Sequence, residues 1–593
     1  MCGIQVLVAL SESLPTPKDV STTGTDVDTC SEVWARLTAA NSRRGPDAHS
    51  EKISLYPLAC VKLGAHVLHL RGPHTQTQPI IAKDTGDMLC WNGEIFDGLD
   101  IGNNNDGAVL LENIQQIKLQ HPTDYILRMF SNIEGPYAFV YLDHAQQKLW
   151  FARDYLGRRS LLTKTINNRT LLLSSVADVG CNVSNDSSGW FELPAQRIYC
   201  LDLANLHQTE HEMFPLGPVV EYKWHYSNLD SSTYSENPTN NTRDLLVLPF
   251  GRVSQDIGND LENTDVHDPN IGKIPDLIND PDWVPFVDSL EHELTTAIKV
   301  RVESIPSNGL DSRVGVLFSG GVDCITIAAL LTAILPRSEP IELFNVAFEN
   351  PRQLRLQANE NAHNVSQHYD VPDRKTGRQG WEELCKIDPT REWRFVEVDV
   401  PYSQVLEYKS HIRQLLIPSN TVMDMSIGMA IWFASRGIGN LISNTQKQGE
   451  KQLRTEYVGC SRVLLLGMGA DEQLGGYSRH RSAWGRGKWK ALGQEIELDL
   501  SRIATRNLGR DDRIISDNAK EARFPFLAAN VVRFLSNIPL GRKMDMRYPR
   551  GMGEKLLLRM LAYRLGLVQA STLAKKAIQF GARSAKMESN QSK

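Results

Sequence analysis

Cys2 is the first residue whose position suggests chemistry, because removal of Met1 would leave its thiol beside a free α-amine. Such an amine titrates near ~8, so at neutral pH it can take the thiol proton, directly or through water, and leave a nucleophilic thiolate. Most cysteines are instead small apolar residues of a core. Considered alone, Cys2 therefore favours a structural role.

Polar residues that suit a free amino acid follow an expected strand further along the chain. Asn92 and Gly93 could stabilise a tetrahedral oxyanion, through the Asn carboxamide and the next backbone N–H. Glu94 and Asp106 could bind an α-ammonium group, and Arg71 could pair with an α-carboxylate. Taken singly, each has a commoner explanation, such as a tight turn for Asn-Gly or solvated surface charge. Taken together after a cysteine at the second position, they predict a site that hydrolyses the amide of glutamine.

A second set of residues lies where the expected buried strand 314–318 turns into a helix. Ser319, Gly320 and Gly321 form this turn, so backbone N–H groups at the start of the helix could bind a phosphate. The glycines lack a Cβ that would intrude on the anion, and Asp323 could hold Mg²⁺ between phosphates. The alternative is a plain strand–turn–helix packing unit. The strand before the turn and the helix after it favour phosphate binding.

A second carboxylate is expected at the same edge of this sheet. The strand expected at 463–466 ends in a glycine-rich stretch that contains Asp471. Ligands of parallel sheets bind at the carboxyl ends of the strands, so Asp471 and Asp323 together could clamp one Mg²⁺. By itself, the stretch is explained equally well as a glycine-rich capping loop.

Two kinds of secondary structure must position these residues. The first ~200 residues contain short apolar runs bounded by Gly, Pro, Asp or Asn, with helices expected at 109–117 and 124–130. This order predicts stacked sheets covered by helices. In the second half, strands expected at 341–348 and 395–400 alternate with helices, which predicts a parallel sheet. Residues 439–459 are expected to form a polar insertion.

Length and composition exclude several classes of protein. A chain of 593 residues exceeds the roughly 250–300 residues of one core, so at least two domains are expected. The net charge of −6 argues against nucleic acid or an anionic membrane as a partner. Nine scattered cysteines without a CxxC pair indicate a reduced protein, and no run approaches the ~20 apolar residues of a membrane span. We therefore expect a cytoplasmic protein whose partners are small molecules.

The first part of the chain resembles the glutaminase domain of asparagine synthetases. The resemblance rests on six ordered blocks: CGI (2–4), RGPD (44–47), NGEIF (92–96), the region of Asp106, EGPYAFVYLD (134–143) and ARDYLGRRSLL (152–162). It implies a type 2 glutamine amidotransferase domain over 2–204, with an α+β N-terminal nucleophile hydrolase fold arranged as an αββα sandwich. Cys2 would be the nucleophile, and Asn92 with Gly93 the oxyanion hole. The family's substrate-binding Arg follows a His by two positions, and we choose Arg71 because it supplies the cation.

The second part resembles the SGGxDS loop and later motifs of these synthetases, which split ATP into AMP and pyrophosphate. The resemblance implies an asparagine synthetase-like ATP-binding domain over 282–593, an α/β parallel-sheet domain of the ATP pyrophosphatase type. Residues 205–281 would be a polar linker or surface excursion. The implied ATP contacts are Leu317, Ser319, Gly320, Gly321, Asp323, Cys324, Gly467 and Met468, with Mg²⁺ at Asp323 and Asp471 and an adenylation lysine at Lys575 or Lys576.

Three positions depart from the family's pattern. Cys324 replaces the usual Ser of the loop, Met468 the Glu of SGEGADE, and Ala528 the Asp of ExRxPFLD. A thiol is a weaker donor than a hydroxyl, and Met cannot accept a proton. The resemblance implies an ATP-dependent carbon–nitrogen ligase that makes asparagine from aspartate, ATP and glutamine through an acyl-adenylate. A non-catalytic scaffold or regulatory protein and an amidotransferase with another acyl acceptor are the alternatives, and a homodimer is one option for its assembly.

Overall fold

The chain forms two compact units in the computed structural model. Unit 1 contains residues 1–248, 413–420 and 504–520, and unit 2 contains residues 249–412, 421–503 and 521–593. The structure describes residues 2–10, 25–178, 189–207, 213–214, 216–217, 219–227, 245–258, 274–306, 311–349, 368–443 and 454–588.

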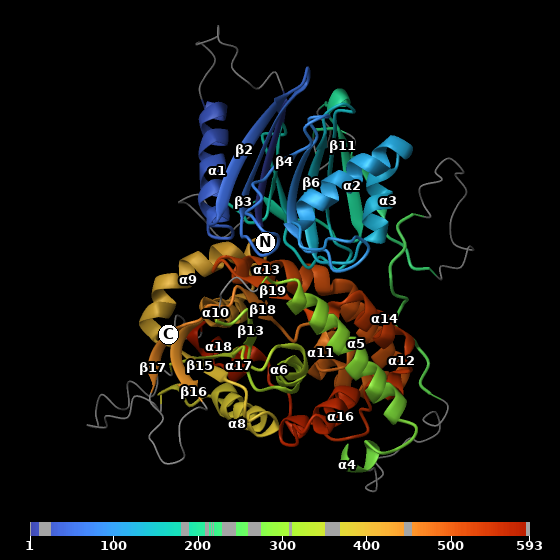
Figure 1. Cartoon of the computed structure of the whole chain (residues 1–593), viewed down its shortest axis with the longest axis vertical. Helices are drawn as coiled ribbons and strands as arrows, with labels where there is room; N and C mark the ends of the chain where they lie inside the picture. Colours follow the sequence, from blue (N-terminus) through green and yellow to red (C-terminus); the bar gives the residue numbers. More distant parts are fainter. Residues whose placement is uncertain are drawn as a thin grey trace. The chain divides into compact units, whose positions relative to one another are not determined.

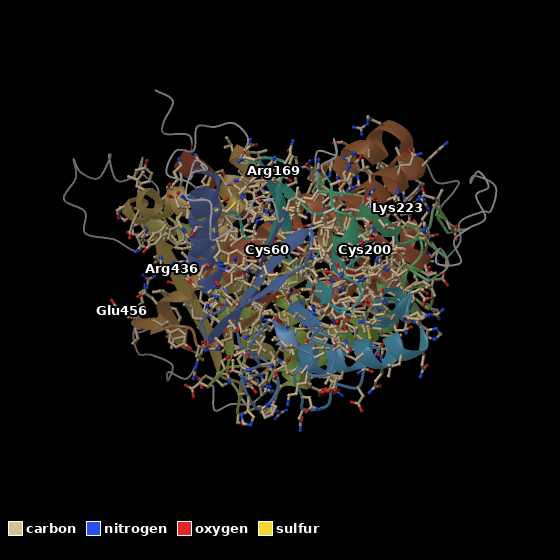
Figure 2. The ribbon with its side chains drawn as sticks, turned by 90° about the horizontal axis from the view of Figure 1, so that it is seen from above. Cys60, Arg169, Cys200, Lys223, Arg436 and Glu456 are labelled. Carbon is tan, nitrogen blue, oxygen red and sulfur yellow. The ribbon has the colours of Figure 1, made fainter. Side chains whose placement is uncertain are left out.

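Unit 1 contains two six-stranded antiparallel sheets. The first has the order β10 (Trp190–Glu192), β8 (Leu162–Ile166), β9 (Thr170–Ser174), β1 (Cys2–Leu10), β3 (Ala59–Val67) and β2 (Ala48–Leu55). The second has the order β12 (Val219–Lys223), β11 (Arg197–Asp202), β7 (Lys148–Arg153), β6 (Tyr137–Asp143), β5 (Met88–Gly93) and β4 (Ile80–Ile81). Figure 2 labels Cys60 on β3 of the first sheet, and Cys200 on β11 and Lys223 on β12 of the second.

The main core of unit 1 contains side chains from both sheets. Ile4, Val6 and Val8 of β1 belong to it together with residues of β6 and β7. Leu7, on the opposite face of β1, packs in a second cluster that includes residues of α1 (Thr25–Ser42). A strand covered on both faces needs apolar side chains at successive positions, which explains the nearly continuous apolar run at the start of the chain.

Two helices lie against the second sheet of unit 1 (Figure 1). They are α2 (Asp106–Gln120), which is longer at both ends than the expected range 109–117, and α3 (Tyr125–Asn132), which begins one residue after the expected range 124–130 and ends two residues after it. The Asn105 side chain caps α2 by accepting a hydrogen bond from the Ala108 N–H. This cap begins α2 at Asp106, and it therefore places that carboxylate in the first helical turn.

Unit 1 also includes two short segments from the second half of the sequence. Residues 504–520 contain a π-helical turn, η4 (Ala504–Leu508), and helix α13 (Gly509–Ser516). Residues 413–420 belong to the same unit, and the Arg513 guanidinium donates to the Leu415 carbonyl across 2.9 Å. The division of the sequence at 204 and 282 assigned both segments to the synthetase-like domain.

Unit 2 is built around a seven-stranded mixed sheet. Its order is β17 (Thr455–Val458), β16 (Ile438–Ser443), β15 (Trp393–Val400), β14 (Ile341–Phe348), β13 (Val314–Leu317), β18 (Val463–Leu465) and β19 (Glu521–Arg523). Neighbouring strands from β15 to β19 in this order are parallel, whereas β16 pairs antiparallel with β15 and β17 pairs antiparallel with β16. The expected polar insertion 439–459 thus contains most of β16 and all of the edge strand β17, while its residues 444–453 lie outside the described part of the chain.

Helices accompany this sheet, as strand–helix alternation predicted. Those described are α4 (Ile274–Leu277), α5 (Val284–Glu303), α6 (Val322–Ile334), α8 (Pro372–Ile387), α9 (Tyr402–Leu416), α10 (Val422–Arg436), α11 (Ala470–Gln473), α12 (Ser478–Ile503), α14 (Ala529–Asn537), α15 (Leu540–Lys543), α16 (Leu556–Arg564), α17 (Ile578–Gly581) and α18 (Ala585–Glu588). α5 buries Leu290, Leu294 and Ile298 at four-residue spacing. Within the described residues, no helix has the length and apolar character needed to cross a bilayer.

The range expected to be a linker contains ordered structure in its described parts. Within 205–281, β12 extends the second sheet of unit 1, and Trp224 is buried. Residues 249–258 belong to unit 2, where the Val253 N–H donates to the Glu497 carboxylate across 2.8 Å. The linker was predicted from the polar composition of 227–243 and 256–282, and most of the first stretch and residues 259–273 of the second lie outside the described residues.

Candidate active sites

A pocket of about 330 Å³ lies beside Cys2 in unit 1. Its lining is Cys2, Val67, Leu68, His69, Leu70, Arg71, Gln78, Trp91, Gly93, Glu94, Asn105 and Asp106. Strand pairing explains why distant residues meet here, since Cys2 pairs with Val67 at the end of β3. The charged, amide and apolar side chains of this lining suit a small polar molecule such as a free amino acid.

Two side-chain amides contact Cys2. Its backbone N–H donates to Asn92 Oδ1 across 3.0 Å, and Gln78 Nε2 donates to Cys2 Sγ across 3.3 Å. The Trp91 N–H holds the Gln78 amide by donating to its Oε1 across 2.7 Å. Gln78 was not among the residues predicted from the sequence. In the sequence, Gln78 lies between two polar residues and a proline. Such a pattern is common in loops, so it does not indicate a contact with the nucleophile.

Asn92 has a donor available for a ligand. Its Nδ2 atom is buried and has no hydrogen-bond partner among the described residues. A buried amide donor without a partner costs free energy, roughly 1–3 kcal/mol, so such a group calls for an explanation. Gly93 follows it at the end of β5, where a Cβ would lie 2.7 Å from the Pro136 carbonyl oxygen. Together they resemble the two donors of an oxyanion hole.

Charged groups of both signs line the same pocket. Arg71 lies 3.9 Å from the Glu94 carboxylate, and its guanidinium donates to the Ile95 carbonyl across 2.8 Å. The Asp106 carboxylate accepts from Trp91 Nε1 across 3.1 Å. Burial raises the pKa of Asp106, and the Trp91 hydrogen bond and the Arg71 charge only partly oppose this shift. An ammonium group beside Asp106 would offset that cost.

The first site of unit 2 is the turn between β13 and α6. Leu317 ends β13, and Gly321 caps α6. The Ser319 hydroxyl accepts from the Gly321 N–H across 3.3 Å. Cys324 lies 3.7 Å from this hydroxyl, and burial raises the pKa of its thiol to about 11. The thiol is therefore neutral at physiological pH, so it adds no anion that would repel a phosphate.

Helix α8 holds this turn from one side. Gly320 has φ +77°, and a Cβ there would lie 2.1 Å from the Thr376 carbonyl oxygen. The Thr376 hydroxyl donates to the Ser319 carbonyl across 2.7 Å. Asn345 on β14 donates to the carbonyls of Phe318 and Asp373, both across 2.8 Å. The turn is thus fixed by backbone contacts that only a glycine at position 320 permits.

Asp323 and Asp471, expected to form a metal clamp, meet at one cation. That cation is the Lys555 ammonium, which lies 2.6 Å from a carboxylate oxygen of each. Lys575 makes a second ion pair with Asp471. Burial opposes ionisation of Asp471, but Lys555 and Lys575 hold its pKa below the usual range. Lys555 was missed, because a basic residue before an apolar helix is usually solvated.

The pair of carboxylates fits one divalent ion together with phosphate oxygens. Mg²⁺ in nucleotide sites binds one or two carboxylates and takes its other ligands from phosphates and water. The Lys555 ammonium lies at the point on which Asp323 and Asp471 converge, so a divalent ion would bind both carboxylates there only if this ammonium moved. No group of three or more His, Cys, Asp or Glu side chains within the described ranges is arranged to hold a metal by itself.

The remaining residues implied by the resemblance occupy different surroundings. Gly467 adjoins the first site, since a Cβ there would lie 2.6 Å from Asp323 Cβ. Met468 follows it and is half-buried. Glu472 holds this loop by accepting from the Gly469 N–H across 3.1 Å and from the Tyr477 hydroxyl across 2.6 Å. Lys576 is exposed and acts electrostatically on Asp373.

Comparison with known proteins identifies two domains. Residues 66–179 match the family model for a glutamine amidotransferase domain, and residues 486–592 match that for asparagine synthase. Asparagine synthetase domain-containing protein 1 of Bos taurus is 36% identical over 93% of this chain and 92% of its own length. The protein of the same name from Gallus gallus is 35% identical over 100% and 98%. The glutamine-hydrolyzing asparagine synthetase of Gallus gallus is 23% identical over 90% and 78%.

Proposed function

Because this chain belongs to the asparagine synthetase domain-containing protein family, we propose that it hydrolyses glutamine at Cys2 and uses the ammonia for ATP-dependent amide synthesis. The observation that carries the proposal is the Cys2–Asn92 contact, in a pocket that also holds Arg71, Glu94 and Asp106. Of the acceptors, aspartate is the one we propose, with asparagine as the product.

The glutaminase step follows from the contacts of Cys2. After loss of Met1, the α-amine takes the thiol proton, and the thiolate attacks the side-chain amide carbon of glutamine. Asn92 Nδ2 and the Gly93 N–H are the donors that would stabilise the negative charge of the oxyanion. The proton passes to the amide nitrogen, ammonia leaves, and water hydrolyses the thioester to glutamate. Gln78, which donates to Sγ, favours the thiolate.

The pocket also holds groups for the backbone of glutamine. Arg71 would pair with the α-carboxylate, while Glu94 and Asp106 would receive the α-ammonium. The raised pKa of Asp106 supports this assignment, because an ammonium ligand would stabilise the ionised carboxylate. The distance of 3.9 Å between Arg71 and Glu94 is short enough for each to orient the other.

The synthetase step is assigned to the turn after β13 and the loop after β18. Ser319, Gly320 and Gly321 would bind phosphate oxygens through N–H and O–H groups. Asp323 and Asp471 are the side chains that would hold Mg²⁺, which would neutralise part of the phosphate charge. Lys555 and Lys575 would stabilise the charge that builds when the carboxylate of aspartate attacks the α-phosphorus and pyrophosphate leaves.

A regulatory protein without synthetase activity is the second candidate, and Met468 is the observation that favours it. A thioether cannot supply the proton transfer or strong hydrogen bond of a carboxylate at this position. Against this candidate, both aspartates and two lysines are present at the proposed ATP site. The two candidates differ in whether the protein makes AMP.

The deciding experiment measures glutamate, AMP, pyrophosphate and asparagine made by the full-length protein with glutamine, aspartate and Mg-ATP. The proposal expects all four products, and it expects Cys2→Ala to lose glutamate formation but to retain ammonia-dependent AMP release. Met468→Glu should raise amide synthesis if the rest of the ATP site is competent. Glutamate without AMP, in the wild type and in Met468→Glu, would establish the regulatory candidate instead.

A cytoplasmic location is proposed with the same function. The cysteines in the described part of the chain are all free, and several of them are buried. Such a protein suits a reducing compartment, where glutamine and ATP are also available.

A further inference from the structure

A buried charged residue of α13 has no part in the proposed chemistry. Asp512 is fully buried in unit 1, and its carboxylate lies 2.8 Å from Arg44 of the RGPD block, which is itself 1% exposed. The Ser160 N–H donates to the same carboxylate across 3.0 Å, and Arg159 lies 3.7 Å away. Removing charges from water is costly, and a buried pair is often less stable than an apolar pair of similar size. The arrangement therefore points to a role beyond stability.

Arg44 leads from this pair to the pocket through the backbone of its own turn. Gly45 is pressed against β3, where a Cβ would lie 2.3 Å from the His66 carbonyl oxygen. The Asp47 N–H donates to the Val67 carbonyl across 2.9 Å, and the His69 N–H donates to the Asp47 carboxylate across 2.7 Å. The turn 44–47 thus holds the start of the loop 67–71.

All five residues of the loop 67–71 line the pocket, and the last of them is Arg71. Asn92 is held in β5 by its pairing with β6. Cys2 pairs with Val67 at the start of the loop, but it also contacts Asn92, and the following residues of β1 pair with β9. The Asn92 contact and the β9 pairing do not involve the turn 44–47, whereas Arg71 lies at the far end of the loop that this turn holds. A shift of the turn would therefore move the cation that pairs with the α-carboxylate more than the nucleophile or the oxyanion donor.

We propose that Asp512 is a positioning residue for glutamine, which acts through Arg44 and the turn 44–47 to hold the loop 67–71 and with it Arg71. The inference rests on the proposed glutaminase function. Asp512 does not line the pocket, so its effect is on the capture of glutamine and not on the thiol chemistry. The segment 504–520, which belongs to unit 1 although it lies in the second half of the sequence, then contributes to the glutamine site through Asp512.

The test compares two reagents that modify Cys2 in the full-length protein. Iodoacetamide reacts with the thiolate and has no amino-acid group, whereas 6-diazo-5-oxo-L-norleucine carries the α-ammonium and α-carboxylate of glutamine. Labelling of the Cys2 peptide is followed by mass spectrometry, and KM and kcat for glutamine are measured alongside. Melting temperatures show that each variant is folded.

Asp512→Asn keeps the shape of the side chain and removes its charge. We expect labelling by the glutamine analogue to slow and the KM for glutamine to rise, each by about tenfold, because a misplaced binding group weakens capture. Labelling by iodoacetamide should stay at the wild-type rate and kcat within about threefold. Asp512→Glu, which restores the charge, should recover most of the loss.

Two further variants make the outcome specific. Asp47→Ala removes the hydrogen bond from the His69 N–H, and Asp47 is exposed, so no buried charge is left without its partner. This variant tests whether the turn 44–47 holds the loop 67–71. We again expect slower labelling by the glutamine analogue and unchanged labelling by iodoacetamide. Asp517→Asn is the matched control on the same segment, because it breaks the 2.7 Å pair with Arg43, whose side chain is 47% exposed. It should leave both labelling rates unchanged.

The inference and the proposed function fail in different ways. A wild type that is not labelled by the glutamine analogue would overturn the glutaminase itself. If the wild type is labelled, two results for folded Asp512→Asn would overturn only the inference. One is labelling at the wild-type rate by both reagents, and the other is an equal loss of rate with both reagents. If Asp512→Asn did not fold, wild-type behaviour of Asp47→Ala would overturn the inference, and the predicted split would uphold it.

Discussion

The two atoms of the Asn92 amide differ in their surroundings, and this difference defines the proposed glutaminase at the scale of single residues. Its Oδ1 accepts from the Cys2 N–H, and its Nδ2 is buried without a partner in the described part of the chain. The first contact fixes the amide beside the nucleophile, so the second atom is free to donate. An unpaired donor held in place costs little reorganisation when charge develops on the substrate.

Asn92→Ala should therefore impair the chemical step more than binding. We expect kcat for glutamine hydrolysis to fall by about 10²–10³ while KM changes little, because the lost hydrogen bond forms mainly in the transition state. Steady-state glutamate release measures both constants. A rise in KM with unchanged kcat would instead assign Asn92 to substrate binding.

Asp106 gives the site a pH dependence of binding. Burial raises its pKa, so as pH falls this carboxyl becomes neutral sooner than an ordinary Asp and loses its attraction for the α-ammonium. We expect the affinity for glutamine to weaken as pH falls through this raised pKa. Calorimetry on Cys2→Ala, which cannot turn glutamine over, measures this binding without the titration of the catalytic amine.

Cys2→Ala/Asp106→Asn is the matched control for this prediction. It should bind glutamine weakly at every pH, since it cannot form the charged contact. A pH dependence that survives in this double variant would place the titrating group elsewhere.

Some residues in the resembling blocks belong to the architecture of unit 1 instead of the pocket. Arg158 lies 2.9 Å from Glu134 and 3.0 Å from Asp154, and all three come from the blocks 134–143 and 152–162. Burial opposes the charge of Arg158, but these carboxylates raise its pKa further above the usual range. The blocks indicated the domain correctly, although most of their charges form ion pairs away from the pocket.

Among the elements, the turn between β13 and α6 depends on helix α8 as much as on its own glycines. The hydroxyl of Thr376 and the amide of Asn345 hold the backbone of the turn at Ser319 and Phe318. Since Asn345 also binds the Asp373 carbonyl, β14 joins α8 to the turn. The proposed phosphate site is therefore assembled from three elements, namely the turn itself, α8 and β14, and the sequence motif covers only the turn.

Gly320→Ala tests this assembly. The new Cβ would meet the Thr376 carbonyl at 2.1 Å in a backbone conformation that alanine disfavours, so the turn or α8 must move. We expect Mg-ATP affinity to fall at least about tenfold, measured by calorimetry, with the glutaminase rate unchanged. Gly485→Ala on α12, where nothing lies within 4 Å of the new Cβ, is the control and should bind Mg-ATP normally. Equal affinities would show that the turn does not bind phosphate.

At the scale of the whole molecule, unit 1 does not correspond to one continuous range of residues. Residues 413–420 and 504–520 complete it, and Arg513 of the second segment binds Ser160 and Glu192 across 2.8 and 2.7 Å. A fragment that ends at residue 248 keeps both sheets but loses these contacts. Its buried Arg44 and Arg159 would then lack the Asp512 carboxylate.

The fragment 1–248 should consequently be much less stable than unit 1 in the intact chain. Each buried charge left without its partner costs about 3–5 kcal/mol, and that is a large fraction of the stability of a typical domain. Thermal unfolding of the fragment should begin at a lower temperature than in the full-length protein, and a peptide of residues 504–520 added in excess should raise it. An isolated fragment as stable as the intact chain would contradict the assignment of these segments to unit 1.

The local features of this fold could be predicted from the sequence because they depend on neighbouring residues. The strand 341–348 and the helix around Leu290, Leu294 and Ile298 follow from apolar periodicity, and the structure contains both. The proposed glutamine residues were also identified before their geometry was known, since their types matched the groups of the substrate. The pocket brings Cys2, Arg71, Glu94 and Asp106 together, as the pattern predicted.

Only the tertiary structure decided which residues complete each site. Gln78 reaches Cys2 across a sequence separation of 76, Lys555 reaches Asp323 across 232, and Asp512 reaches Arg44 across 468. Periodicity and short motifs depend on residues that are close in the sequence. Contacts between residues so far apart leave no such local pattern, so they could not be predicted from it. The sequence by itself determined the family and the local elements, and it suggested the two proposed chemistries. Folding determined which cation contacts both aspartates and which distant helix contacts Arg44.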